Sequence, residues 1–166
     1  KNGKLLRNKI KNHPRYPYHL LREEMQEFIL DKLQLLIERK LIKGIGENGT
    51  EYTVIAQILD LPKEILRLIQ KFDFTKKNPK LIYINTGETM ISLQDSILVT
   101  FLNLAGFDIL FFVPTGYQSV ENYFAEKLME EHQIGEYKYD MQVPDLNNIS
   151  TNSTRSSWRR KLFRRG

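Results

Sequence analysis

The sequence predicts an α/β fold, in which a small, mostly parallel, Rossmann-like sheet is flanked by helices and preceded by an all-helical segment. One apolar, strand-like run ends in Thr86-Gly87, and a second ends 29 positions later in Thr115-Gly116. A strand, a helix and a strand within about 30 residues make a βαβ unit, whose helical crossover places the strands parallel. Before this unit, apolar residues recur at helical spacing, which predicts the all-helical segment.

The length and composition indicate a globular protein with a hydrophobic core. The chain has 166 residues, of which 41% are hydrophobic, enough for one domain. It has no cysteine, which excludes disulfides and cysteine-based metal or nucleophile sites and fits a reducing cytoplasm. The longest apolar stretch, 97–107, is too short to cross a bilayer, so we expect a cytoplasmic protein with no membrane partner. The chain begins at Lys1 without a methionine, which suggests a piece of a longer protein.

Charge is segregated along the chain. Residues 1–19 contain six Lys or Arg and no acid, and residues 151–166 again contain six and no acid. The intervening residues 20–150 carry 13 basic side chains against 20 acidic ones. This pattern predicts either that the basic ends fold back on an acidic body or that they bind an external polyanion. Both alternatives remain open at the level of sequence.

Changes in composition divide the chain into four regions. They are a basic lead-in or linker at 1–19, a helical segment of three helices at 20–78, a Rossmann-like α/β unit at 79–149, and a basic, Ser/Thr/Arg-rich C-terminal segment at 150–166. The lead-in contains two prolines and no sustained period, which predicts extended chain.

Apolar periodicity places the elements within these regions. The helical segment is expected to hold helices at about 20–43, at 51–59 and from Pro62 onward. The α/β unit is expected to hold strand 81–84, helix 93–105, strand 109–113 and helix 119–131. The first strand is aliphatic on both sides, which predicts cover on both faces. Ser92 and Asp95 form a capping-box pattern at the start of helix 93–105, which is apolar almost all round and should be buried.

The two Thr-Gly corners are the main candidate binding site. The carboxyl edge of a parallel sheet is where ligands bind, because loops and helix N-termini meet there and attract anions. A phosphorylated or nucleotide-like small molecule is therefore the expected ligand. The candidate ligand-binding residues at these corners are Thr86, Gly87, Glu88, Thr89, Thr115, Gly116 and Tyr117. Ordinary βα turns favour the same residue types, so two plain turns remain the alternative.

Other chemistry has weaker support in the sequence. Neither GxGxxG nor GxxxxGK[ST] is present, and no nucleophile elbow accompanies a Ser-His-Asp order. The three histidines have no metal-ligand spacing, so no metal site is predicted. Glu88, Asp95 and Asp108 would supply acid–base chemistry only if they converge. Catalytic residues and cofactors are therefore left unassigned, and so is the question of whether the protein is an enzyme.

The basic C-terminal segment allows two interpretations. Its arginines Arg155, Arg159 and Arg160 are candidates to fold over the strand edge and neutralise a bound anion, because guanidinium forks suit phosphate geometry. Trp158 and Phe163 lie between its basic residues, a pattern that suits stacking on nucleic acid or packing on the body of the protein. The helices at 50–72 loosely suggest a helix-turn-helix. A non-enzymatic module that binds nucleic acid is thus the alternative function.

Two stretches of the sequence resemble a known family. They are PKLIYINTGETMISLQDSILVTFLNLAGFDILFFVPTGYQSVENYF at 79–124 and STNSTRSSWRRKLFRRG at 150–166. They resemble the C-terminal part of the bacterial YceG-like family, described as a component of a "biosynthetic module" in Ter-type gene clusters for tellurite resistance, toxic-anion resistance and stress response. The resemblance implies a cytoplasmic stress-response role that involves a nucleotide-like metabolite. It also implies the rest of the full-length protein and other Ter-cluster proteins as partners, and it identifies no catalytic residues.

Overall fold

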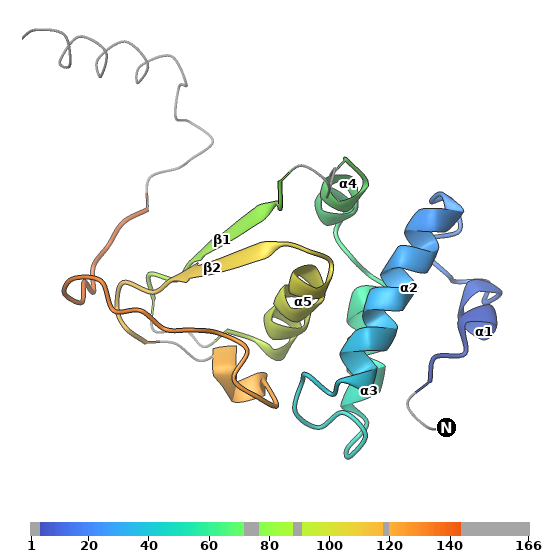
Figure 1. The fold of residues 1–166 in the computed structure, drawn as a ribbon, viewed down its shortest axis with the longest axis horizontal. Helices are drawn as coiled ribbons and strands as arrows, with labels where there is room; N and C mark the ends of the chain where they lie inside the picture. Colours follow the sequence, from blue (N-terminus) through green and yellow to red (C-terminus); the bar gives the residue numbers. More distant parts are fainter. Residues whose placement is uncertain (1–3, 72–76, 88–90, 118–119, 144–166) are drawn as a thin grey trace, which may run out of the picture.

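A computed structural model describes residues 4–71, 77–87, 91–117 and 120–143 (Figure 1). The elements are α1 (Arg7–Lys11), α2 (Glu23–Glu38), α3 (Thr50–Ile58), α4 (Lys63–Lys71), β1 (Lys80–Ile84), α5 (Leu93–Leu104), β2 (Asp108–Phe112) and the 3-10 helix η1 (Val120–Tyr123). The α5 helix lies between the sheet and the pair α2 and α3, and α1 lies on the outer side of α2. The predicted mixture of helices with a small parallel sheet is confirmed.

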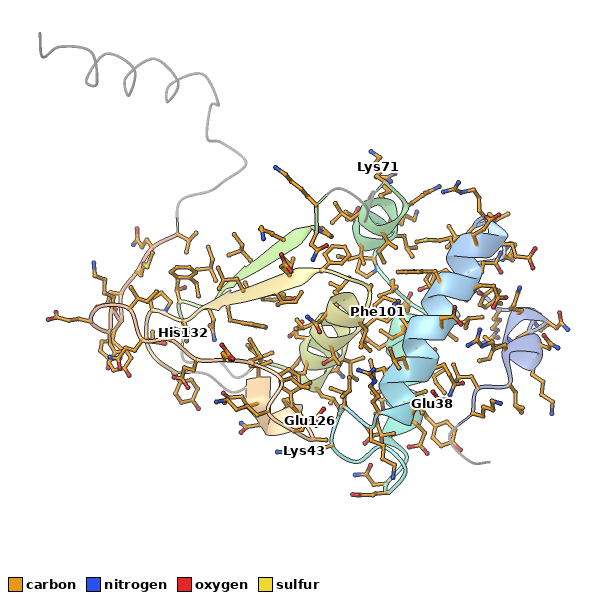
Figure 2. All side chains as sticks on the ribbon, viewed as in Figure 1. Glu38, Lys43, Lys71, Phe101, Glu126 and His132 are labelled. Carbon is orange, nitrogen blue, oxygen red and sulfur yellow. The ribbon has the colours of Figure 1, made fainter. Side chains whose placement is uncertain are left out.

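Helix α5 is the centre of the hydrophobic core. Its capping box is formed as predicted, because Ser92 Oγ accepts from Asp95 N at 3.0 Å and Asp95 Oδ2 accepts from Ser92 N at 3.4 Å. Ile97, Phe101 and Leu102 are fully buried, which confirms that this helix is enclosed. Figure 2 marks Phe101 between α5 and α2. Burial of each such side chain stabilises the fold by roughly 1.5–3 kcal/mol.

The two strands pair in parallel, as predicted from the βαβ spacing. The register runs from Lys80 paired with Asp108 to Ile84 paired with Phe112. Side chains alternate between the two faces, and the face toward α5 is apolar and partly buried. On that face the rings of Tyr83 and Phe111 stack with centroids 5.1 Å apart. The core therefore continues from the helices onto one face of the sheet.

The opposite face of the sheet is exposed in the described residues. The prediction that the first strand is covered on both faces was therefore wrong for this part of the chain. Its exposed apolar side chains are Ile82, Ile84, Leu110 and Phe112. One helical crossover covers one face of a parallel pair, and a Rossmann-like sheet requires further strands and helices on the other.

The helix predicted at 119–131 is also not formed, since only the short 3-10 helix η1 occupies this part of the chain. The backbone at Phe124 instead pairs with the chain near Ile42. Lys43 N donates to Tyr123 O at 2.8 Å, and Ala125 N donates to Leu41 O at 2.9 Å. These bonds use backbone groups that a continuing helix would need. Figure 2 labels Lys43 and Glu126 on either side of this pairing.

The basic lead-in is folded rather than extended over its described residues, so that prediction was wrong. Helix α1 packs its basic side chains against acidic residues of α2. Arg7 Nη1 lies 2.6 Å from Asp31 Oδ1, and Lys11 Nζ lies 2.7 Å from Glu27 Oε1. Of the two alternatives for the basic ends, folding back on an acidic body is therefore the one seen at the N-terminus.

Two buried tyrosines follow α1 and fix its connection to the core. The hydroxyl of Tyr18 donates to Ile58 O at 2.6 Å and accepts from Leu61 N at 2.9 Å. Burial raises the pKa of Tyr18 to about 12. The neighbouring Tyr16 packs edge-on against Tyr18, but its own buried hydroxyl has no hydrogen-bond partner among the described residues. Tyr18 thus connects the N-terminal segment to the α3–α4 junction.

The helices of the 20–78 region follow the predicted order with adjusted ends. Helix α2 ends at Glu38 instead of residue 43, because Lys40 adopts a left-handed φ of 50°. Leu41 N then donates back to Leu36 O at 3.4 Å, which closes the helix in a Schellman arrangement. Helix α4 starts directly after Pro62, as predicted. Within the described ranges, no helix has both the length and the apolar character to cross a bilayer.

Candidate functional site

The parallel register brings the two Thr-Gly corners to one edge of the sheet. We call this edge the carboxyl rim and define it as residues 85–87 and 113–117. The ladder ends where Ile84 pairs with Phe112, and Asn85 N donates to Phe112 O at 2.9 Å just beyond it. The chain therefore leaves both strands at the same side and the same level, as the βαβ spacing predicts.

Backbone amides at the carboxyl rim are bonded within the protein. Gly87 N donates to Asn85 Oδ1 at 3.3 Å, and Tyr117 N donates to Thr115 Oγ1 at 3.2 Å. Gly116 N donates to Val113 O at 3.0 Å. Three donors expected to face an anion therefore serve the turns themselves. Asn85 was missed at the sequence level, although an asparagine two residues before a turn glycine is a typical signal for this side-chain bond.

Tyr137 lies against the second corner. Gly116 has a φ of +70°, and a Cβ atom added there would collide with the Tyr137 ring. Lys138 N donates to Pro114 O at 2.8 Å, which holds this segment beside the rim. Thr115 is buried at the same corner. Glycine is thus required at 116 by backbone conformation and by close approach of a side chain. The sequence carries no signal for the Tyr137 contact, because it joins positions in unrelated segments.

The N-terminus of α5 already holds a negative group of the protein. The carboxylate of Asp95 accepts from the backbone N and the Oγ of Ser92, so it lies within the first turn of the helix. This acid occupies the position where a bound anion would gain from the helix dipole. Burial raises the pKa of Tyr83, with a smaller contribution from the nearby charge of Asp95. The rim next to β1 is therefore not a ready-made anion site.

The two acid–base candidates in the described residues, Asp95 and Asp108, do not converge. Asp108 lies at the amino end of β2, where its Oδ2 is 2.8 Å from Lys80 Nζ. Hydrogen bonds from Lys80 and then Asn78 lower the pKa of Asp108. Asp95 caps α5, which starts after the chain has left the other end of β1. These two carboxylates thus lie at opposite ends of the βαβ unit.

Several predicted site residues lie outside the described part of the chain. They are Glu88, Thr89, Arg155, Arg159 and Arg160. The three histidines are spread over the molecule, with His132 Nε2 3.7 Å from Glu130 Oε2 and His19 Nδ1 2.9 Å from Tyr16 O. Among the described residues, no group of three or more His, Asp or Glu side chains is arranged to hold a metal ion.

An open groove of about 850 Å³ lies between α1 and α2. Helix α1 lies on the side of α2 that faces away from the sheet (Figure 1). The walls of the groove include Arg7 and Asp31, which pair with each other, and Gln34, which accepts from Leu5 N at 2.6 Å. Arg7, Asp31 and Gln34 thus attach the N-terminal segment to α2.

Comparisons with known proteins identify a family for the chain. A family model described as "YceG domain" matches residues 1–157. The chain is similar to the "Uncharacterized protein YceG" of Bacillus subtilis (strain 168), with 31% identity over 93 residues. The match covers 54% of this chain and 17% of that protein, so the chain spans a small part of the curated relative. No solved structure matches the chain.

Proposed function

Because the chain belongs to the YceG domain family, we propose that it is the C-terminal part of a cytoplasmic stress-response protein of the tellurite and toxic-anion resistance type. We further propose that it binds a phosphorylated or nucleotide-like metabolite at the carboxyl rim. The observation that supports this ligand site is the parallel pairing of β1 and β2, which brings both Thr-Gly corners to one edge. The rest of the longer protein is the expected source of further strands that would make the sheet Rossmann-like.

Side chains, rather than backbone amides, are the expected ligand contacts. The rim amides of Gly87, Gly116 and Tyr117 are bonded internally, so they give an anion little direct support. The hydroxyls of Thr86 and Tyr117 remain as polar contacts at the two corners. The positive charge would come from the arginines of the C-terminal segment, whose planar guanidinium groups bind phosphate through paired hydrogen bonds.

A thermal-shift experiment tests this site with a matched pair of variants. A panel of nucleotides and sugar phosphates should raise the melting temperature of the wild-type chain. Gly116→Val should abolish that rise, because it displaces Tyr137 at the rim. Gly135→Val is the control, since Gly135 has a similar φ of +82° but has no neighbour within 4 Å of an added Cβ. A wild-type chain that no member of the panel stabilises would contradict the proposal.

A second candidate function is a non-enzymatic module that binds nucleic acid or a Ter-cluster protein. It is favoured by a basic stripe on α4, formed by Lys63, Arg67 and Lys71 at successive turns of one helix face. All three side chains are exposed, and within the described residues none of them forms an ion pair. This contrasts with α1, whose Arg7 and Lys11 pair with acidic residues of α2. Such an exposed stripe provides electrostatic contacts for a polyanion.

Salt dependence distinguishes this candidate from the metabolite site. The association constant for an oligonucleotide should fall steeply as salt increases. In a plot of its logarithm against the logarithm of the salt concentration, each neutralised phosphate should contribute a slope of about −0.9. Charge reversal at Lys63, Arg67 and Lys71 should reduce that slope, and deletion of residues 155–166 should reduce it further. Oligonucleotide binding that is absent at low salt would exclude the nucleic-acid module.

A further inference from the structure

The sheet face that points away from α5 is apolar and exposed over both strands. We call it the open sheet face. Its exposed fractions are 57% for Ile82, 41% for Ile84, 49% for Leu110 and 53% for Phe112. The register places Ile82 beside Leu110 and Ile84 beside Phe112, so the four side chains form two adjacent rows. A contiguous apolar patch of this kind marks a surface that another segment covers.

The two ends of the open sheet face differ in character. At the amino end, Lys80 and Asp108 form an ion pair of 2.8 Å beside the first apolar row. At the carboxyl end, the second row borders the carboxyl rim. The described segment 120–143 passes this rim, where Lys138 bonds to Pro114, but leaves the open sheet face exposed. A covering segment would therefore lie along the strands and end near the rim.

We propose that the C-terminal segment, residues 150–166, docks on the open sheet face through Trp158, Leu162 and Phe163. The spacing of these residues places them on one side of a short helix. The basic residues Arg160, Lys161 and Arg164 fall on the opposite side of such a helix, which would remain in solvent, whereas Arg159 falls on the same side as the apolar residues. The three large apolar side chains of the segment would pack on the four apolar side chains of the open sheet face.

The connecting chain is long enough for this docking. The last described residue, Val143, lies on the side of the molecule where the strands reach the carboxyl rim (Figure 1). Residues 144–157 can span up to about 50 Å when extended. A compact protein with the 166 residues of the whole chain has a radius of gyration of about 15 Å. Trp158 can therefore reach either end of the open sheet face without strain.

Charge complementarity selects the same occupant. The described segment 120–143 contains six acidic and two basic side chains, and the acidic ones are all exposed. Residues 150–166 contain six basic side chains and no acid. The N-terminal basic segment sets a precedent within this fold, since α1 docks on acidic residues of α2. Opposite charges therefore favour bringing the C-terminal segment onto this side of the protein.

A second copy of the chain is a poorer occupant. Four side chains form a patch much smaller than the roughly 800 Å² per partner of a standard interface. A segment of the same chain instead docks at an effective concentration in the millimolar range. Intramolecular docking thus needs less buried area than a dimer would.

This inference goes beyond the proposed ligand site, because docking requires no ligand. It has one consequence for that site, however. A segment anchored beside Ile84 and Phe112 would hold its arginines close to the carboxyl rim. The C-terminal segment would then complete the rim with positive charge and cover the sheet at the same time.

Trp158 provides a direct test, since it is the single tryptophan of the chain. In the full chain without ligand, docking predicts blue-shifted Trp158 emission and slow quenching by acrylamide. Leu110→Asp should shift the emission to the red and raise quenching severalfold. Leu68→Asp on α4 is the matched control, because Leu68 is 50% exposed and Leu110 is 49% exposed. It should leave Trp158 emission unchanged.

Three results would overturn the proposal. If the emission wavelength of Trp158 in the wild-type chain equals that of a free peptide of residues 150–166, the segment is undocked. Equal effects of Leu110→Asp and Leu68→Asp would place Trp158 elsewhere. Protection of Trp158 that disappears on dilution would assign the open sheet face to a second copy. Far-UV circular dichroism checks folding of each variant, and Ile82→Lys repeats the test if Leu110→Asp unfolds. A chain that binds no metabolite yet protects Trp158 would leave this inference intact.

Discussion

The helical layer and the sheet of this protein bury their apolar residues to different extents. Helices α2, α3 and α5 pack against one another, so the apolar side of each is in contact with the other two. The β1–β2 sheet has a partner on one face and exposes the other. Stability should therefore reside in the helical layer, and recognition should reside in the sheet. Substitutions of comparable size in the two regions can break or sharpen this contrast.

The largest expected effect is in the helical layer. Phe101→Ala should lower the free energy of unfolding by about 3–5 kcal/mol, because Phe101 is fully buried between α5 and α2. The matched substitution Phe112→Ala, on the open sheet face, should lower it by no more than about 1 kcal/mol. Urea denaturation of both variants measures the difference. Equal losses would mean that the open sheet face is as well covered as the core, and the contrast would then fail.

The next effect concerns the hydroxyl of Tyr18. Tyr18→Phe should lower the free energy of unfolding by about 1–3 kcal/mol, because Ile58 O loses its bond from the hydroxyl and Leu61 N loses its acceptor. Tyr16→Phe is a close control, since the Tyr16 hydroxyl is buried without a partner among the described residues. Its removal should be neutral or stabilising. If both variants lose the same stability, the Tyr18 bonds do not fix the N-terminal segment to the core.

The elements that the sequence predicts correctly are those set by local signals. Ser92 and Asp95 lie three residues apart and cap α5 from within the same turn, so their spacing alone is sufficient. The parallel pairing follows from the length of one crossover. Pro62 ends one segment and opens α4 in a similarly local manner. These features need no knowledge of distant parts of the chain.

The features that the sequence does not predict depend on distant contacts. The apolar spacing of Val120 and Phe124 fits a helix, but the backbone at 123–125 pairs with residues 41–43 instead. The lead-in shows no apolar period, yet it folds because α2 offers acidic partners. The same limit applies to the candidate site. The common edge of the two corners was predictable, whereas the contact of Tyr137 with Gly116 was not.

A smaller effect tests how the N-terminal segment is attached to the helical layer. Hydrogen bonds from Lys11 and then Arg7 lower the pKa of Glu27. A carboxyl group with a lowered pKa contributes stability above its ordinary pKa, and this contribution is lost as pH falls through the folded value. Glu27→Gln should therefore flatten the loss of melting temperature at acidic pH, below about pH 4.5. The change in stability caused by Glu27→Gln should be smaller than that caused by Tyr18→Phe, because Glu27 is partly exposed to solvent.

The control for Glu27 lies on the same helix. Glu24→Gln removes an exposed acid that forms no ion pair among the described residues. It should therefore leave the decrease of melting temperature at acidic pH unchanged. High salt should weaken the difference between wild type and Glu27→Gln. A Glu27→Gln profile that runs parallel to wild type at all pH values would show that α1 is held by its apolar contacts alone.

The smallest expected effect is a gain at the end of α2. Lys40 has a left-handed φ of 50°, which costs a residue with a Cβ about 1–2 kcal/mol. Lys40→Gly removes that cost but adds about 0.5–1 kcal/mol of chain entropy to the unfolded state. We therefore expect a net gain in unfolding free energy of roughly 0.5 kcal/mol. Lys43→Gly, at a nearby position without a left-handed φ, should instead lower stability slightly. If both glycines destabilise the chain equally, the end of α2 carries no backbone strain, and the helical layer is then as unstrained at its boundary as it is in its core.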